Sequence, residues 1–146
     1  MAPAFSHFGI CVSDLARSLR FYCEGLGFEE AESYRIGDDF APLMELEHVD
    51  VRSQYIRRDG LSIELLAYDA PETLGPASRR PVNQLGLTHL SFRVDDVDAA
   101  AARLRALGGS VHPQTRTTLP MGSAVLDFVY CTDPDGTRIE LMHLPG

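Results

Sequence analysis

Apolar residues follow two spacings along the chain, and the two spacings alternate in a fixed order. Segments 5–12 and 86–94 contain alternating, aromatic and β-branched residues, so each is predicted to be a strand. After each strand, apolar residues recur at helical spacing, which predicts a helix with one buried face. These positions are Leu15, Leu19, Tyr22 and Leu26 after the first strand, and Val97, Ala101, Leu104 and Leu107 after the second.

Further strand-like segments follow each predicted helix, so each half of the chain is predicted to be a β-α-β-β-β module. These segments are 41–47, 51–57 and 61–68 in the first half, and 110–112, 123–131 and 137–143 in the second. Segment 113–122 is expected to be a loop. We expect a single domain over residues 1–146, with module one at 5–69, a linker at 70–84 that is rich in Pro, Ala and Arg, and module two at 85–146.

The two modules repeat the positions of chemically active residues. A histidine precedes the alternating apolar pattern of each first strand, at His7 and at His89. A glutamate stands in each last strand, four residues after the glycine of an Asp-Gly pair, at Glu64 and at Glu140. A sheet with a helix on one face leaves its other face uncovered, so two such modules are expected to pair. The predicted fold is therefore α+β, with two paired βαβββ modules forming a curved mixed sheet around a concave metal site and the helices outside.

Side chains alternate between the two faces of a strand, and this alternation predicts which residues line the concave surface. The purely apolar face belongs under the helix, so the two histidines and the two glutamates point the other way. The same alternation adds Cys11, Ser91, Arg93 and Met142 to the concave surface as candidate substrate-binding residues. Arg93 is expected to hold a substrate carboxylate or phosphate, or to pair with an inward acid such as Glu45.

Two imidazoles and two carboxylates on one surface indicate a divalent metal site. A lone histidine in a strand is more often structural, and a lone glutamate often faces water. Two inward carboxylates without a cation would repel each other, whereas a bound cation accounts for all four residues together. The ligand set lacks thiolates, which suits one ion of Zn, Ni, Co, Mn or Fe(II) per site.

The charge, the apolar segments and the cysteines of the chain indicate which partners and which cellular compartment to expect. The formal net charge is −8 and the 13 basic residues are scattered, so neither nucleic acid nor a membrane surface is expected as partner. No apolar stretch approaches the roughly 20 residues of a membrane span. The three cysteines lack C-x-x-C spacing, so neither a disulfide framework nor a thiolate zinc site is indicated, and a cytoplasmic location is expected.

The chain resembles the vicinal oxygen chelate superfamily, which includes glyoxalase I, methylmalonyl-CoA epimerase, extradiol dioxygenases and fosfomycin or bleomycin resistance proteins. The resemblance rests on the paired modules and on segments 21–28 (FYCEGLGF) and 133–141 (DPDGTRIEL). It implies the metal ligands His7, Glu64, His89 and Glu140, a small-molecule substrate and a homodimer.

The resemblance leaves several reactions open. Cys11, Tyr68 and Leu85 stand where glutathione-type glyoxalases carry arginine, asparagine and arginine, which disfavours a glutathione-derived substrate. The epimerase branch implies a second catalytic glutamate, for which Glu45 is the candidate, although Glu47 has the same strand parity.

The dioxygenase branch implies Fe(II) held by His7, His89 and Glu140, with Tyr130 as the catalytic tyrosine. The leading prediction is instead a metal-dependent lyase or isomerase that takes a proton next to a carbonyl and stabilises the enediolate or enolate. Glu140, Glu64 or Glu45 would act as the base. The alternatives are a binding protein that sequesters a small molecule or antibiotic, and an extradiol ring-cleaving dioxygenase.

Overall fold

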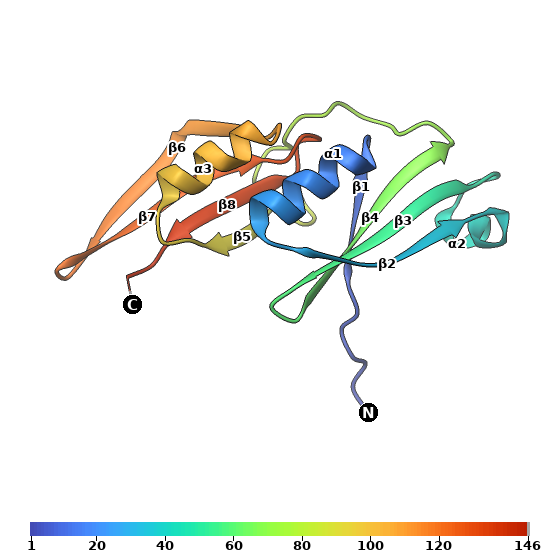
Figure 1. The fold of residues 1–146 in the computed structure, drawn as a ribbon, viewed down its shortest axis with the longest axis horizontal. Coiled ribbons are helices and arrows are strands. Elements are labelled where there is room, and N and C mark those ends of the chain that lie inside the picture. The colour runs from blue at the N-terminus through green and yellow to red at the C-terminus, as the bar shows by residue number, and fades with distance from the viewer. Residues whose placement is uncertain (146) are drawn as a thin grey trace. The chain divides into compact units, whose positions relative to one another are not determined.

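The computed structural model describes residues 1–145 and divides the chain into two compact units, Met1–Gly75 and Pro76–Gly146 (Figure 1). The elements of the first unit are β1 (Phe8–Val12), α1 (Leu15–Leu19), the π-helical turn η1 (Arg20–Gly25), β2 (Glu29–Ile36), the 3-10 turn η2 (Asp38–Phe40), α2 (Ala41–Met44), β3 (Asp50–Arg58) and β4 (Leu61–Ala70). The elements of the second unit are β5 (Leu90–Arg93), α3 (Val97–Ala106), β6 (Ser110–Met121), β7 (Ala124–Thr132) and β8 (Arg138–His143).

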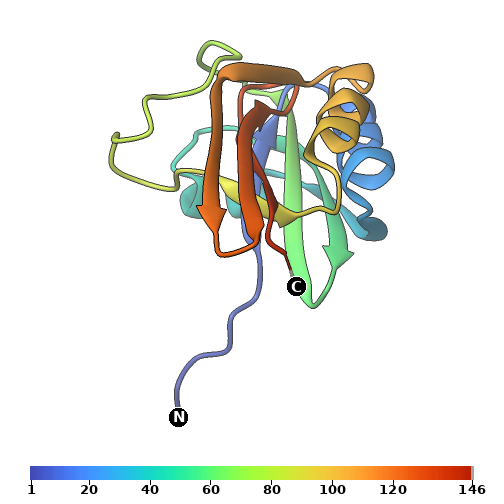
Figure 2. The ribbon, with the colours of Figure 1, turned by 90° about the vertical axis from the view of Figure 1, so that its left-hand side faces the viewer.

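The two units have the same connectivity. The first sheet has the order β1-β4-β3-β2, with β1 parallel to β4 and the other neighbours antiparallel. The second sheet has the order β5-β8-β7-β6, with β5 parallel to β8 and the other neighbours antiparallel. Helices α1 and α3 each lie on one face of their own sheet (Figure 2). The prediction of an α+β fold with two mixed sheets is confirmed.

The face of each sheet under its helix is the apolar core of that unit. In β4, Ile63 and Leu65 are fully buried, whereas Glu64 between them is only partly covered. Strand β8 repeats this pattern with the fully buried Ile139 and Leu141. Burial of each such side chain stabilises the fold by about 1.5–3 kcal/mol, so the alternation fixes which face the glutamates occupy.

Aspartates begin the two main helices. The Asp14 carboxylate accepts a hydrogen bond from the backbone N–H of Arg17 at 3.0 Å, and the Asp96 carboxylate accepts one from Ala99 at 2.9 Å. Each bond satisfies an N–H group that the first helical turn leaves without a partner. Among the described residues, no helix combines the length and the apolar character that crossing a membrane would need.

The predicted strand at 41–47 is wrong, because helix α2 and a turn occupy this segment. Ala41 is buried together with Val49 and Val51, so the apolar residues of the segment cover a small core of their own. Glu45 ends α2 in the left-handed conformation, with φ of 57°, and it is exposed. The expected placement of Glu45 on a strand is therefore also wrong.

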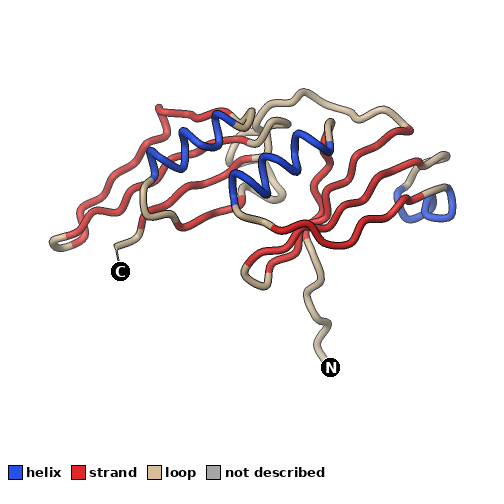
Figure 3. The backbone as a smooth tube through the Cα atoms, in the orientation of Figure 1, coloured by secondary structure: helices blue, strands red, loops and turns tan. Residues whose placement is uncertain are grey.

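Two edge strands differ from the sequence prediction. Strand β2 was not predicted, because it lies at the edge of its sheet and its residues are mostly exposed and polar, without clear alternation. The loop expected at 113–122 is wrong, because β6 continues to Met121 and pairs with β7 (Figure 3). Pro113 and Pro120 are tolerated there because an outer strand has one side without ladder hydrogen bonds.

Candidate functional site

The first unit brings His7 and Glu64 together. His7 precedes β1 and Glu64 lies in the middle of β4, where it is in register with Gly9. The Nε2 atom of His7 lies 3.2 Å from Oε2 of Glu64, and their side chains are 31% and 14% exposed. The Ser6 hydroxyl lies 2.8 Å from His7 Nδ1, and the Ser53 hydroxyl donates to Glu64 Oε1 at 2.5 Å. Both side chains are therefore held by a hydroxyl neighbour.

The second unit repeats this arrangement with His89 and Glu140. The Nε2 atom of His89 lies 3.6 Å from Oε2 of Glu140, and their side chains are 28% and 21% exposed. The Thr88 hydroxyl lies 2.8 Å from His89 Nδ1, and the Ser91 hydroxyl donates to Glu140 Oε2 at 2.7 Å. Sequence reasoning missed Ser6 and Thr88, although a hydroxyl residue before each histidine is part of the repeat.

A tyrosine ring packs against each histidine. Tyr55 is in register with Glu64, and its ring centroid lies 5.2 Å from that of His7 in an edge-on contact. Tyr130 is in register with Glu140, and its ring lies 5.6 Å from that of His89. Burial raises the pKa of Tyr55, and the charge of Glu64 and a hydrogen bond with it raise that pKa further, so the phenol keeps its proton at neutral pH.

The geometry of the first pair fits two neighbouring ligands of a divalent metal, and that of the second pair is close to it. Two donor atoms that each lie about 2.1 Å from a cation, at 90–110°, are about 3.0–3.4 Å apart. The 3.2 Å separation in the first unit lies within this range, and the 3.6 Å separation in the second is slightly wider. A hydroxyl that accepts from Nδ1 leaves the Nε2 lone pair available for a metal. Neither unit by itself, within residues 1–145, gathers three His, Cys, Asp or Glu side chains into a metal-binding group.

The other predicted site residues lie on the same sheet faces with less contact to these pairs. Cys11 is exposed on β1, in register with Leu66. Met142 approaches the site of the second unit, because the Ser91 hydroxyl lies 3.1 Å from its sulfur as well as close to Glu140. Arg93 ends β5 in register with Met142 and is exposed. In the described part of the first unit, Glu45 does not join His7 and Glu64 as a third ligand.

The three cysteines are expected to differ sharply in reactivity. Burial raises the pKa of Cys131 to about 11, and burial together with Glu30 and Glu24 raises that of Cys23, whereas Cys11 is exposed. Only the thiolate reacts with iodoacetamide, so Cys11 should be alkylated first at about pH 8 and Cys131 only after unfolding. Peptide mass spectrometry over time measures the order, and rapid labelling of Cys131 in the folded protein would contradict it.

Comparison with known proteins agrees with this fold. The model of the Glyoxalase/Bleomycin resistance protein/Dioxygenase superfamily matches residues 4–141, and the chain belongs to this superfamily. The chain is 32% identical over 155 residues to a 2-epi-5-epi-valiolone epimerase from an Actinomyces species, covering 99% of this chain and 81% of the relative.

Two solved structures share the fold. A glyoxalase family protein from Bacillus cereus superposes with a TM-score of 0.83 at 21% identity, covering 100% of this chain and 97% of the other. The fosfomycin resistance protein FosX from Listeria monocytogenes, in complex with Mn(II) and sulfate, superposes with a TM-score of 0.63 at 20% identity, covering 99% and 95%.

Proposed function

We propose that this protein is a divalent-metal-dependent lyase or isomerase that moves a proton next to a carbonyl group of a small organic substrate. The observation that carries the proposal is the imidazole–carboxylate pair that each unit presents, with a hydroxyl beside each partner. Family membership supports it, and so does the relative that is named an epimerase.

The proposed ligands are His7, Glu64, His89 and Glu140, two from each unit, and together they hold one Zn, Ni, Co, Mn or Fe(II) ion. The four come from one chain or from two copies in a homodimer. When bound, the cation supplies Lewis-acid stabilisation of the negative charge that develops on the substrate's carbonyl oxygen. The Mn(II) present in the FosX structure supports a divalent ion in this superfamily.

The two glutamates have different surroundings, which assigns them different roles in the proposal. Glu64 accepts hydrogen bonds from Ser53 and from Tyr55, so the orientation of its carboxylate is fixed. The contacts of Glu140 with Ser91 and His89 both use Oε2. We therefore assign Oε1 of Glu140 to take the substrate's proton, a role that Glu140 has in addition to being a ligand, while Glu64 serves only as a ligand. The exposed Glu45 is a weaker candidate for the base.

Elemental analysis of the purified, tag-free protein tests the metal site. We expect about one divalent metal ion per chain, lost in a His7→Ala/Glu140→Ala double variant. A His48→Ala/Glu47→Ala variant is the matched control, because it removes the same residue types from exposed positions. A metal content that is zero after reconstitution would reject the catalytic proposal and favour a sequestering binding protein.

A ring-cleaving dioxygenase is the second candidate, favoured by the packing of Tyr130 against His89. In that case the metal is Fe(II) and turnover consumes oxygen. Oxygen uptake with catechols, and its loss in Tyr130→Phe, would replace the lyase or isomerase assignment. Proton exchange that needs no oxygen would exclude the dioxygenase.

A further inference from the structure

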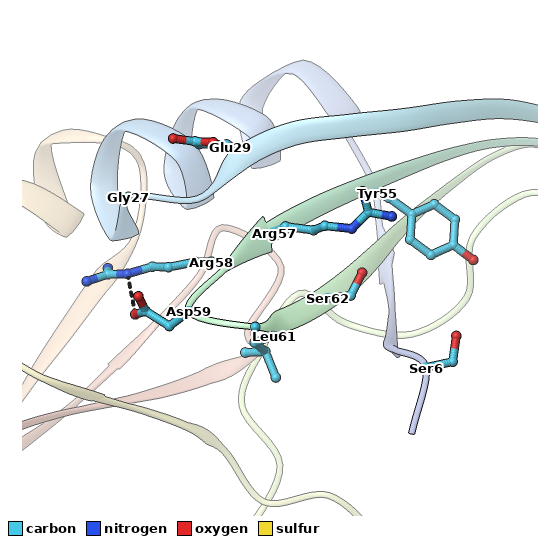
Figure 4. A pocket seen from close by; sticks show the side chains of 10 residues that line it. Ser6, Gly27, Glu29, Tyr55, Arg57, Arg58, Asp59, Leu61 and Ser62 are labelled. Carbon is cyan, nitrogen blue, oxygen red and sulfur yellow. Dashed lines mark hydrogen bonds and ion pairs between the residues drawn. The ribbon is translucent and has the colours of Figure 1, made fainter. Parts of the chain in front are cut away.

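A pocket of about 750 Å³ opens on the first unit next to the His7–Glu64 pair (Figure 4). Its lining includes Ser6, Tyr55, Arg57 and Ser62. Two of these residues also contact the pair, because the Ser6 hydroxyl lies 2.8 Å from His7 Nδ1 and the Tyr55 ring packs against the His7 ring. The pocket therefore adjoins the predicted metal ligands of the first unit.

The pocket continues along the same face of the β3–β4 hairpin. Tyr55 is in register with Glu64, and Arg57 is in register with Ser62. Residues two positions apart on a strand point to the same face and lie about 7 Å apart. Figure 4 shows the Arg57 side chain extending along β3 toward Tyr55, with Ser62 on the neighbouring strand β4 and Ser6 on the segment before β1. A guanidinium and hydroxyl donors thus line the pocket on the same face as Glu64, and the Cα atoms of Arg57 and Ser62 lie about 7 Å along the hairpin from those of Tyr55 and Glu64.

The two arginines of the pocket, Arg57 and Arg58, have different hydrogen-bond partners. Arg58 is tied to the protein, because it donates to the carboxylate of Asp59 at 3.0 Å and to the Leu26 carbonyl. Arg57 is held by one surface carboxylate, and its two terminal nitrogens donate to Glu32 at 3.0 and 2.6 Å. The Arg57 side chain is 53% exposed, and a guanidinium has five N–H donors, of which Glu32 uses two. Arg57 is therefore the cation that an anionic ligand can reach.

We infer that this pocket binds a distal anionic group of the substrate, a carboxylate or a phosphate, through Arg57 and the neighbouring hydroxyls. The inference rests on the proposed function, in which the substrate's carbonyl lies at the metal ligands. The Cα atoms are about 7 Å apart and the guanidinium extends back toward Tyr55 (Figure 4), so the anionic group lies within a few covalent bonds of the carbonyl. The substrate class is thus a small organic acid or phosphate ester with its anionic group a few bonds from the carbonyl. This group replaces Glu32 on Arg57.

Two matched pairs of probes test the inference by calorimetry on the metal-loaded protein. 2-Oxoglutarate is compared with 2-oxopentanoate, which lacks the distal carboxylate, and dihydroxyacetone phosphate is compared with dihydroxyacetone. We expect at least one anionic probe to bind about tenfold more tightly than its partner, since a charge-assisted hydrogen bond contributes about that factor at a half-exposed site. The pair that shows the preference identifies carboxylate or phosphate as the recognised group.

Three variants test whether Arg57 causes the preference for the anionic probe, expressed as the ratio of the two affinities in a probe pair. Arg57→Gln should reduce the ratio to about one, and Glu32→Gln should raise it by about two- to fivefold, because the competing carboxylate is gone. Arg52→Gln is the matched control, because it too removes a β3 arginine from a surface ion pair. The partner of Arg52 is Asp69, at 3.2 Å, and Arg52 does not line the pocket. This variant should leave the ratio unchanged.

A ratio near one in the wild type, a ratio that Arg57→Gln does not change, or no binding of either anionic probe at about 10 mM would overturn the inference. Failure of the metal site is separate, because it appears in the elemental analysis. If the protein holds no metal, the same ratios are measured on the metal-free chain, where the Arg57-dependent preference is still expected.

Discussion

Replacing Glu140 by glutamine is expected to slow proton exchange next to a substrate carbonyl by about 100- to 10,000-fold, the usual contribution of a positioned base. Glutamine keeps the size of the side chain and an oxygen that can accept from Ser91, but its amide cannot take a proton. Glu64→Gln is expected to slow exchange much less, because Glu64 is already occupied by the hydroxyls of Ser53 and Tyr55 and is assigned a ligand role.

Deuterium incorporation from D2O, followed by NMR on a panel of 2-oxo acids and hydroxyketones, measures this difference. The comparison uses the panel member that the wild type exchanges fastest, and rates are divided by the metal content of each variant. Glu47→Gln is the control, because it neutralises an exposed carboxylate outside the site. A larger loss in Glu64→Gln than in Glu140→Gln would reverse the assigned roles, and intact exchange in both variants with metal retained would reject the mechanism.

The sequence predicts the two pairs well because each depends on a short-range rule. Glu64 lies between Ile63 and Leu65, whose complete burial leaves the glutamate only the opposite face. The first strand runs parallel to the last, and His7 stands two residues before the Gly9 that is in register with Glu64. The internal repeat then transfers the same geometry to His89 and Glu140, where the nitrogen–oxygen separation is again close, at 3.6 Å. Metal binding by these residues stays a prediction.

Several residues around the first pair could not be predicted because they depend on pairing between distant segments. Tyr55 reaches His7 only through the register of β3 with β4, which alternation in a single strand does not fix. Glu45 was misplaced because Ala41 and its apolar neighbours resemble a strand, yet they pack around Val51 as a short helix and turn. Arg57 was overlooked because its partner Glu32 lies on β2, the edge strand without an alternating pattern.

The repeated Asp-Gly pair has different surroundings in the two units, and this difference should appear in stability. Gly60 has φ of 77° and nothing within 4 Å of the position of an added Cβ. Gly136 has φ of 91°, and an added Cβ would lie 2.5 Å from the carbonyl carbon of Ser78, a backbone atom that cannot rotate away. The Ser78 segment is itself held nearby, because Arg138 donates to the Arg80 carbonyl at 2.6 Å.

Gly136→Ala is therefore expected to destabilise the protein by about 3–4 kcal/mol, against about 1–2 kcal/mol for Gly60→Ala. Both variants force alanine into the left-handed region, which accounts for the smaller figure. Gly136→Ala must also displace the backbone around Ser78 and weaken the Arg138 contact, which accounts for the remainder. Each kcal/mol lowers the melting temperature by about 3 °C for a chain of this size, so drops of about 10 °C and about 4 °C are expected in calorimetry. Equal drops would show that segment 76–88 moves aside without cost, and that the close approach of Ser78 to Gly136 does not contribute to stability.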